Sequence, residues 1–192
     1  MKQEFIDKTF DKRDYKENPL KKGEYENCSF TSCDLSGTDL SDIMFIDCRF
    51  TGCNLSLANI NNTVFRDCVF GECKLLGLRF DSCNKFGLAF RFEQCTLNHS
   101  SYYKTKIQGT LFKNSQLQEA DFSECDLTGS VFDHCDLTRA LFEQTILEKA
   151  DLRNAYNFSI DPERNRLKKA RFSLTGVPGL LDKYHIDIDK AI

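Results

Sequence analysis

Large apolar residues recur at every fifth position along most of the chain, and the residue two places before each of them is small. The segments 28–30, 33–35 and 38–40 show the pattern as Cys-Ser-Phe, Cys-Asp-Leu and Thr-Asp-Leu. A period of five fits neither the 3.6-residue period of an α-helix nor the two-residue period of a β-strand. The pattern therefore indicates an internal repeat, in which one short unit is stacked many times.

The repeat runs in two phases that differ by two residues. In the first phase the large residues run from Tyr25 to Phe80, and in the second they run from Phe92 to Leu152. The shift falls within 84–91, where Lys85 occupies a position that should hold a large apolar residue. Because the pattern resumes unchanged afterwards, we expect a kink or small bulge there and not a domain boundary.

The distribution of charge predicts which positions face inward. Between residues 25 and 152, Lys85 is the only charged residue at a large position or at the small position before it. Burying an unpaired charge is costly, so these two positions should point into a core and the other three outward. A chain that turns a corner every five residues closes a square after twenty, and its coils should lie ~4.8 Å apart, the spacing of paired strands. Two aromatic columns are predicted: Phe30, Phe50, Phe70 and Phe90 form one, and Phe92, Phe112 and Phe132 form the other.

The composition is that of one ordinary domain. The chain has 192 residues, is 41% apolar and carries a formal charge of −3, which gives no support for direct binding to nucleic acid. Its N-terminus shows no signal peptide, and no apolar run reaches the ~18 residues needed to cross a membrane. We therefore expect a cytoplasmic protein without a membrane partner.

All ten cysteines occupy the small position of the repeat, and none shows the CxxC spacing typical of zinc sites. We interpret them as small buried residues that share their position with Ala, Ser and Thr. This interpretation predicts no metal, no cofactor and no disulfide framework, and free thiols fit a reducing compartment. The residues are Cys28, Cys33, Cys48, Cys53, Cys68, Cys73, Cys83, Cys95, Cys125 and Cys135.

The two ends depart from the repeat and divide the chain into 1–24, 25–160 and 161–192. We expect 1–10 to form a degenerate first coil and 11–24 to be irregular. Near 176–184 the apolar spacing predicts a short α-helix with Thr175 as its N-cap. This segment either caps its own coil or caps it and also forms a homodimer. The candidate dimerisation residues are Val177, Leu180, Leu181, Tyr184, Ile186 and Ile188.

The order small, Asp or Asn, Leu or Phe, then two variable residues closely resembles the pentapeptide-repeat proteins. That resemblance implies an all-β solenoid, a right-handed quadrilateral β-helix, here followed by the C-terminal helix. The segments 161–162, 168–174 and 177–184 look like the tails of Qnr and MfpA-type members, which protect DNA gyrase and topoisomerase IV from fluoroquinolones. This narrower resemblance implies a rod that dimerises through its C-terminus. Many Qnr-type proteins carry two long projecting loops, and the repeat here admits no such insertion between 25 and 152.

Acidic residues are concentrated in the last coils of the repeat. Residues 115–151 contain nine acidic residues against Arg139 and Lys149, and all nine stand at outward positions on all four faces. At ~4.8 Å per coil this is about one net charge per 1.3 Å, comparable with the ~1.7 Å of duplex DNA. The basic segment 164–171 should partly neutralise them. These residues, called the acidic girdle below, are Glu119, Asp121, Glu124, Asp126, Asp133, Asp136, Glu143, Glu148 and Asp151.

Two functional hypotheses follow, and neither is enzymatic. His99 and His134 stand at outward positions, and no phosphate-binding glycine loop is present. The first hypothesis is a DNA-mimicking homodimer that binds a type II topoisomerase and modulates fluoroquinolone action, as the resemblance implies. The second is a β-helical scaffold for an unrelated protein partner, in which Asp and Asn suit exposed turns and keep the surface solvated.

Overall fold

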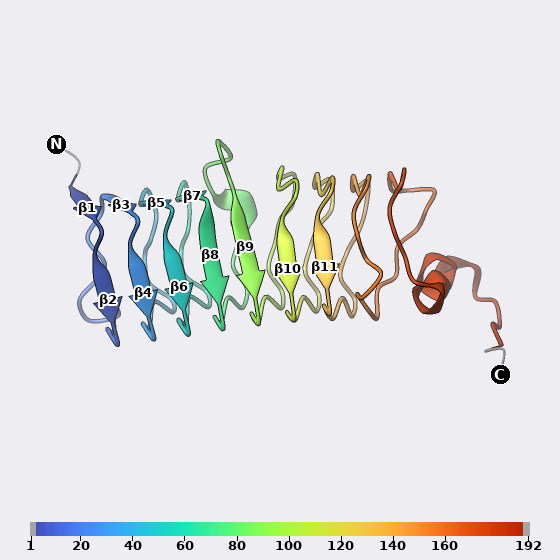
Figure 1. The fold of residues 1–192 in the computed structure, drawn as a ribbon, viewed down its shortest axis with the longest axis horizontal. Coiled ribbons are helices and arrows are strands. Elements are labelled where there is room, and N and C mark those ends of the chain that lie inside the picture. The colour runs from blue at the N-terminus through green and yellow to red at the C-terminus, as the bar shows by residue number, and fades with distance from the viewer. Residues whose placement is uncertain (1–2, 190–192) are drawn as a thin grey trace.

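The computed structural model describes residues 3–189 and shows a rod of stacked coils (Figure 1). Parallel strands form two sheets that run along the rod, and isolated β-bridges such as Asp34 with Asn54 and Asp39 with Asn59 link the coils elsewhere. The expected β-solenoid is confirmed. One sheet holds β1 (Glu4–Ile6), β3 (Glu24–Glu26), β5 (Met44–Ile46) and β7 (Val64–Arg66); the other holds β2 (Thr9–Asp11), β4 (Ser29–Thr31), β6 (Arg49–Thr51), β8 (Cys68–Gly71), β9 (Phe90–Glu93), β10 (Leu111–Lys113) and β11 (Val131–Asp133).

Residues twenty apart pair across neighbouring coils, as the five-residue period predicts. Phe30 is the register partner of Phe50, and their rings stack with centroids 4.7 Å apart. The corners between faces repeatedly place a residue in the left-handed region, as Asn62 and Asp67 do with φ of 55° and 53°. Asp, Asn and Gly tolerate this conformation better than other residues, which explains why they recur at the second position after the large one.

The inward positions form one continuous core. All ten cysteines are buried and free, as expected. They also donate hydrogen bonds: the Cys48 thiol donates to the Tyr25 carbonyl at 3.2 Å, and Thr63 makes the same contact to Leu40 at 2.8 Å. In both cases the acceptor lies 23 residues earlier, at the large position of the preceding coil. The small position therefore favours a compact side chain that can donate, which Cys, Ser and Thr all provide.

The phase break changes the register of one strand pair from 20 to 22 residues. Strand β9 pairs with β8 so that Phe92 lies beside Phe70, and their rings stack at 5.3 Å. The prediction of two columns, with Phe90 above Phe70, is therefore wrong, because the sheet keeps one aromatic column through the break. Lys85 is exposed, as its charge requires. Phe90, which stands at a small position, turns inward and packs against Phe80 and Phe92 at 5.1 and 4.9 Å.

The first coil is more regular than the sequence suggests. Tyr15 and Leu20 are both buried, so the inward phase continues through the segment 11–24. The Arg13 guanidinium lies over the Phe10 ring, 5.8 Å from its centroid. A charged residue is tolerated at this small position because no further coil packs beyond it, and its cation covers an aromatic ring.

The C-terminal helix is wrong in type and in its cap. Residues Leu174–Leu180 (η2) and Asp182–Tyr184 (η3) form 3₁₀-helix, and the N-cap is Ser173 in place of Thr175. Pro178 lies inside η2, where an α-helix would lose a hydrogen bond and clash with the preceding turn. A tighter helix of three residues per turn also breaks the predicted single stripe, because Val177 and Leu180 align while Leu181 lies on another row.

This terminal segment is fastened to the end of the rod. The amide of Ile160 donates to the Gly179 carbonyl at 2.9 Å, and a Cβ at Gly179 would collide with the backbone of Phe158. The Lys183 ammonium lies 2.7 Å from carboxylate oxygens of both Asp161 and Glu163. The segment therefore covers the last coil, which would otherwise expose its core.

Candidate functional site

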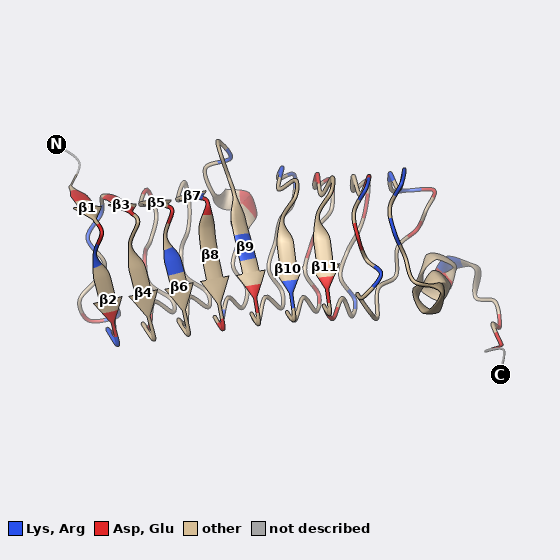
Figure 2. Ribbon diagram, viewed as in Figure 1, with Lys and Arg blue, Asp and Glu red and all other residues tan. Residues whose placement is uncertain are grey.

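The acidic girdle lies on the outer surface of the last coils, as predicted. None of its nine carboxylates belongs to a buried residue, and they alternate with basic residues along the rod (Figure 2). The parallel register brings the basic residues close, because side chains one coil apart stack at the spacing of paired strands. The charge of the girdle therefore depends on what stands one coil before and after each acidic residue.

Five girdle carboxylates form ion pairs with Lys or Arg. Glu143 contacts Arg164 at 2.5 Å, and Glu148 contacts Arg166 at 2.6 Å. These two arginines come from the basic segment 164–171, so the expected neutralisation is confirmed in part. The remaining three pairs join Glu119 with Arg139, Glu124 with Lys104, and Asp151 with both Arg153 and Arg171.

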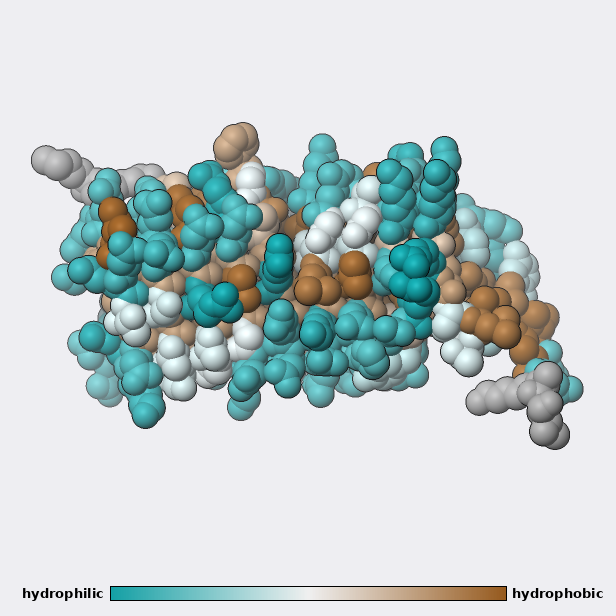
Figure 3. Space-filling view, viewed as in Figure 1, coloured by the Kyte–Doolittle hydropathy of each residue, from teal (hydrophilic) through white to brown (hydrophobic). Residues whose placement is uncertain are grey.

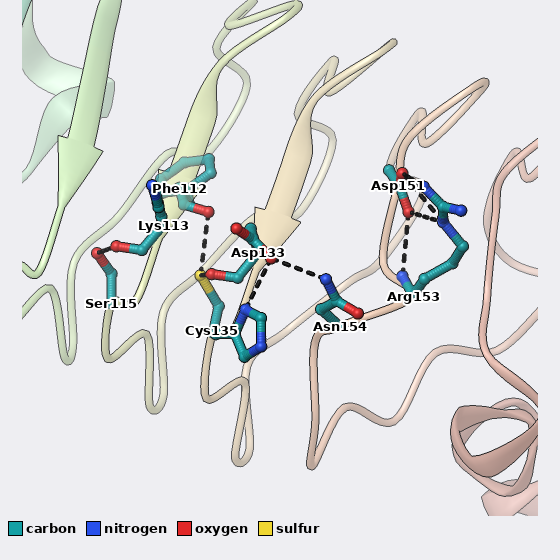
Figure 4. Close-up of polar contacts among 9 residues, drawn as sticks. Phe112, Lys113, Ser115, Asp133, Cys135, Asp151, Arg153 and Asn154 are labelled. Carbon is teal, nitrogen blue, oxygen red and sulfur yellow. Dashed lines mark hydrogen bonds and ion pairs between the residues drawn. The ribbon is translucent and has the colours of Figure 1, made fainter.

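Four girdle carboxylates have no Lys or Arg partner among the described residues: Asp121, Asp126, Asp133 and Asp136. Asp133 accepts hydrogen bonds from the Asn154 amide and the His134 ring, both at 2.8 Å (Figure 4). The Asn154 contact, then the His134 contact, lower the pKa of the Asp133 carboxyl, so it is ionised at neutral pH. These four, called the unpaired aspartates below, are the negative charges that a partner would meet first.

The charge density of this region is lower than the girdle alone implies. Residues 115–171 contain eight basic and eleven acidic residues, a net charge of −3. At ~4.8 Å per coil these residues span roughly 14 Å, which gives about one net charge per 5 Å against ~1.7 Å in duplex DNA. The comparison with DNA therefore holds for the girdle positions and not for the whole surface around them.

An apolar surface lies at the C-terminal end of the rod (Figure 3). Leu174 is 89% exposed, and Val177, Tyr184, Ile186 and Ile188 are also exposed. Of the predicted dimerisation residues, Leu180 and Leu181 are partly buried. Sequence reasoning missed Leu174, which precedes the predicted helix, and Tyr156, which comes from the last full coil and is 49% exposed. We call the exposed residues the C-terminal apolar surface: Tyr156, Leu174, Val177, Tyr184, Ile186 and Ile188.

The described residues show no arrangement of a catalytic or metal site. His134 is exposed and contacts Asp133, whereas the neighbouring Cys135 is buried and donates to the Phe112 carbonyl at 3.3 Å (Figure 4). The two side chains therefore do not form a nucleophile pair. Within residues 3–189 no group of His, Cys, Asp or Glu side chains is placed to hold a metal ion. In the same part of the chain no helix has the length and apolarity to span a membrane.

The family model described as "Pentapeptide repeat region" matches residues 24–90, 45–122 and 79–155, which together cover more than half of the chain. The chain belongs to the pentapeptide-repeat family. No curated protein matches it in sequence.

Solved structures of other pentapeptide-repeat proteins share the fold. A trypsin-treated form of QnrB1, a plasmid-mediated fluoroquinolone resistance protein, aligns with a TM-score of 0.64 and 17% identity over 98% of this chain and 100% of that one. Full-length QnrB1 gives 0.64 and 16% over 96% and 100%. HetL, a regulator of heterocyst differentiation from the cyanobacterium Nostoc sp. strain PCC 7120, gives 0.57 and 12% over 88% and 85%. At these identities the likeness concerns the fold.

Proposed function

We propose that this pentapeptide-repeat protein is a non-catalytic homodimer that binds DNA gyrase or topoisomerase IV and modulates the action of fluoroquinolones. The observation that carries the proposal is the alignment with QnrB1 over nearly the whole of both chains, C-terminal segment included. The free, buried cysteines favour a reducing compartment such as the cytoplasm, where these enzymes act.

The C-terminal apolar surface supports the dimer. Leu174, Ile186 and Ile188 are side chains that a monomer gains nothing by exposing, and a cluster of exposed apolar residues is typical of an interaction site. The surface also lies at one end of the rod, so a two-fold axis there would join two rods end to end (Figure 3). Such a dimer places one acidic girdle on each side of its centre.

The unpaired aspartates are the part of the girdle that we expect a partner to recognise. The other five carboxylates already interact with Lys or Arg, so a cationic groove would have to displace those partners before it could bind them. The unpaired aspartates hold only neutral donors or His134, and their charge remains available. The recognition of a DNA-binding groove is therefore proposed to rest on four charges per subunit.

Binding to immobilised gyrase tests this assignment. Replacing Asp121, Asp126, Asp133 and Asp136 by Asn should weaken binding at least about tenfold at low salt, because complementary charges control association. The matched control replaces Asp7, Asp42, Asp47 and Asp67 by Asn, which changes the net charge equally near the other end. Equal losses in both variants would show that only overall charge matters and would contradict the assignment.

The neutralised girdle keeps a second candidate function open, namely a scaffold for an unrelated protein partner. HetL, which shares the fold, is described as a regulator of cell differentiation and not as a resistance protein. A partner bound mainly through apolar or shape contacts should remain bound at high salt, whereas recognition by the unpaired aspartates should weaken as the Debye length falls. The salt dependence of binding therefore separates the two functions.

A further inference from the structure

The rod carries a basic band at the phase break that the formal charge hides. Residues 25–83 contain four basic and eight acidic residues, and residues 115–151 contain two and nine. Between them, residues 84–113 contain five basic residues and one acidic residue, a net charge of +4. Basic residues appear there on β9 and β10 (Figure 2). The surface is therefore negative, positive and negative in turn along the rod.

The basic residues at the break are largely unneutralised. Among the described residues, Arg66, Lys85, Arg91 and Lys106 take part in none of the ion pairs, whereas Lys104 pairs with Glu124 at 3.4 Å. Arg66 belongs to β7 but lies against the break, because a Cβ at Gly87 would stand 3.2 Å from its Nε. Lys85, Arg91 and Lys106 are exposed. Four free cations thus surround the place where the register changes.

An exposed phenylalanine stands among these cations. Phe86 is 80% exposed and lies in the loop that joins η1 (Phe80–Ser82) to β9, which projects from the rod (Figure 1). The loop is held by specific contacts: the Asn84 side chain accepts from the Phe86 amide at 3.0 Å, Gly87 takes a φ of 69°, and the Lys85 ammonium donates to the Lys104 carbonyl at 3.2 Å. Phe86 is therefore presented in one arrangement, which lowers the entropy cost of binding.

The same break leaves a hollow between coils. It measures about 280 Å³ and lies where β9 is displaced by two residues from the regular register. Arg91 and Phe90 line it beside the projecting loop, and Asp67 is the one carboxylate that contributes to its wall. The regular coils give no reason for a protruding aromatic side chain, four free cations and a hollow to coincide at a single place.

We propose that the phase break is a docking site for a short acidic segment of a partner protein, with an apolar side chain of that segment packed against Phe86. The band spans about 1.5 coils, or roughly 7 Å, and acidic bands flank it within the Debye length of ~8–10 Å. A nucleic acid that ran along the rod would place its phosphates over those acidic bands and be repelled. A short acidic segment fits within the band. This site is separate from the acidic girdle and does not depend on the topoisomerase proposal.

The probe for this site is a short fluorescein-labelled peptide of glutamates around one central phenylalanine, followed by fluorescence anisotropy at low salt. The full chain should bind it, and Phe86→Ser should weaken binding about tenfold through the lost apolar contact. The triple variant Lys85→Glu, Arg91→Glu, Lys106→Glu should weaken it by more. Leu57→Ser, which removes another exposed apolar residue at a corner of the rod, should leave binding within about twofold.

A second triple variant controls for overall charge. Lys12→Glu, Lys21→Glu and Lys168→Glu change the net charge equally at exposed residues away from the break, and should have little effect on binding. Circular dichroism confirms that each variant is folded. The proposal is overturned if the peptide does not bind, if both triple variants weaken binding equally, or if a labelled oligothymidylate of the same length binds more tightly than the peptide.

Discussion

Phe92 stacks on Phe70 with ring centroids 5.3 Å apart and ring planes inclined by 17°, although 22 residues separate them. The preceding step of the same column, from Phe50 to Phe70, spans 20 residues with centroids 4.9 Å apart. The coil therefore keeps its aromatic column and moves the two extra residues into the projecting loop. A cost remains on the neighbouring face, where Lys85 cannot fill its inward position, and Phe90 fills that space instead.

This compensation predicts that Phe90→Cys changes sign with the register. In the natural chain the substitution restores the usual small residue but leaves a void beside Phe80 and Phe92, and should lower the free energy of unfolding by about 3 kcal/mol. Urea unfolding followed by circular dichroism measures the change.

The matched background deletes Phe86 and Gly87 and carries Lys85→Leu, so that an apolar residue fills the inward position and the register returns to 20. There Phe90 is overpacked, and Phe90→Cys should raise the free energy of unfolding by about 1–3 kcal/mol. The same sign in both backgrounds would contradict the compensation.

Two buried tyrosines should respond in opposite directions to loss of the hydroxyl. The Tyr102 hydroxyl is buried without a hydrogen-bond partner, so Tyr102→Phe should stabilise the protein by about 1 kcal/mol. The Tyr25 hydroxyl donates to the Lys21 carbonyl at 2.7 Å, so Tyr25→Phe should destabilise it by about 1 kcal/mol. Thermal unfolding of the two variants gives both signs in one experiment, and a destabilised Tyr102→Phe protein would show that its hydroxyl is satisfied.

Acid should loosen the N-terminal coil first. Contacts with Lys16 and Lys22 lower the pKa of Asp34 and of Asp39 to about 2, and both pairs join the first coil to the second. Because the folded pKa lies below the ordinary value of about 4, this stabilisation is complete above pH ~4 and is lost as pH falls towards 2. Both pairs are solvent-exposed, so the effect is small.

Hydrogen exchange of the β1 and β2 amides measures this local opening. Its increase between pH ~4 and ~2, corrected for intrinsic exchange rates, should shrink in the variant Lys16→Met, Lys22→Met. An unchanged pH dependence in that variant would show that the two ion pairs do not hold the coil.

The C-terminal apolar surface should control the mass in solution. Leu174→Ser combined with Ile186→Ser removes two of its exposed side chains and should convert a dimer into a monomer in light scattering. Leu57→Ser, at an exposed position far along the chain, is the control and should leave the dimer intact. A dimer that survives the double substitution would place the interface elsewhere on the rod.

The sequence predicted the coil well because burial alone decides it. Phe30, Cys48 and Phe112 are buried where the five-residue period puts them, and the exclusion of charge from inward positions needs no knowledge of neighbours. The stacking of Phe92 on Phe70 could not be predicted, because the position of an inserted residue depends on which pairing preserves more contacts. The 3₁₀ geometry could have been suspected from Gly176, Pro178 and Gly179.

The candidate site was less predictable than the fold. The nine girdle acids were correctly placed outside, but their pairing with Arg164 and Arg166 depends on the register beyond the polar insert at 161–166, which returns Arg166 to the partner position of Ile146. The basic band was visible in the sequence and was lost only because charges were summed over residues 25–114, where they cancel. Charge is therefore best counted by coil in such a rod.

The most direct test of the proposed function is DNA supercoiling by gyrase in the presence of an inhibiting fluoroquinolone. The account predicts that the full chain restores supercoiled product at micromolar concentration, and that the Asn variant of the four unpaired aspartates restores less than the control variant Asp7→Asn, Asp42→Asn, Asp47→Asn, Asp67→Asn. Neither rescue with the drug nor inhibition without it, at any concentration where the protein is dimeric, would contradict the proposal that this protein acts on a type II topoisomerase.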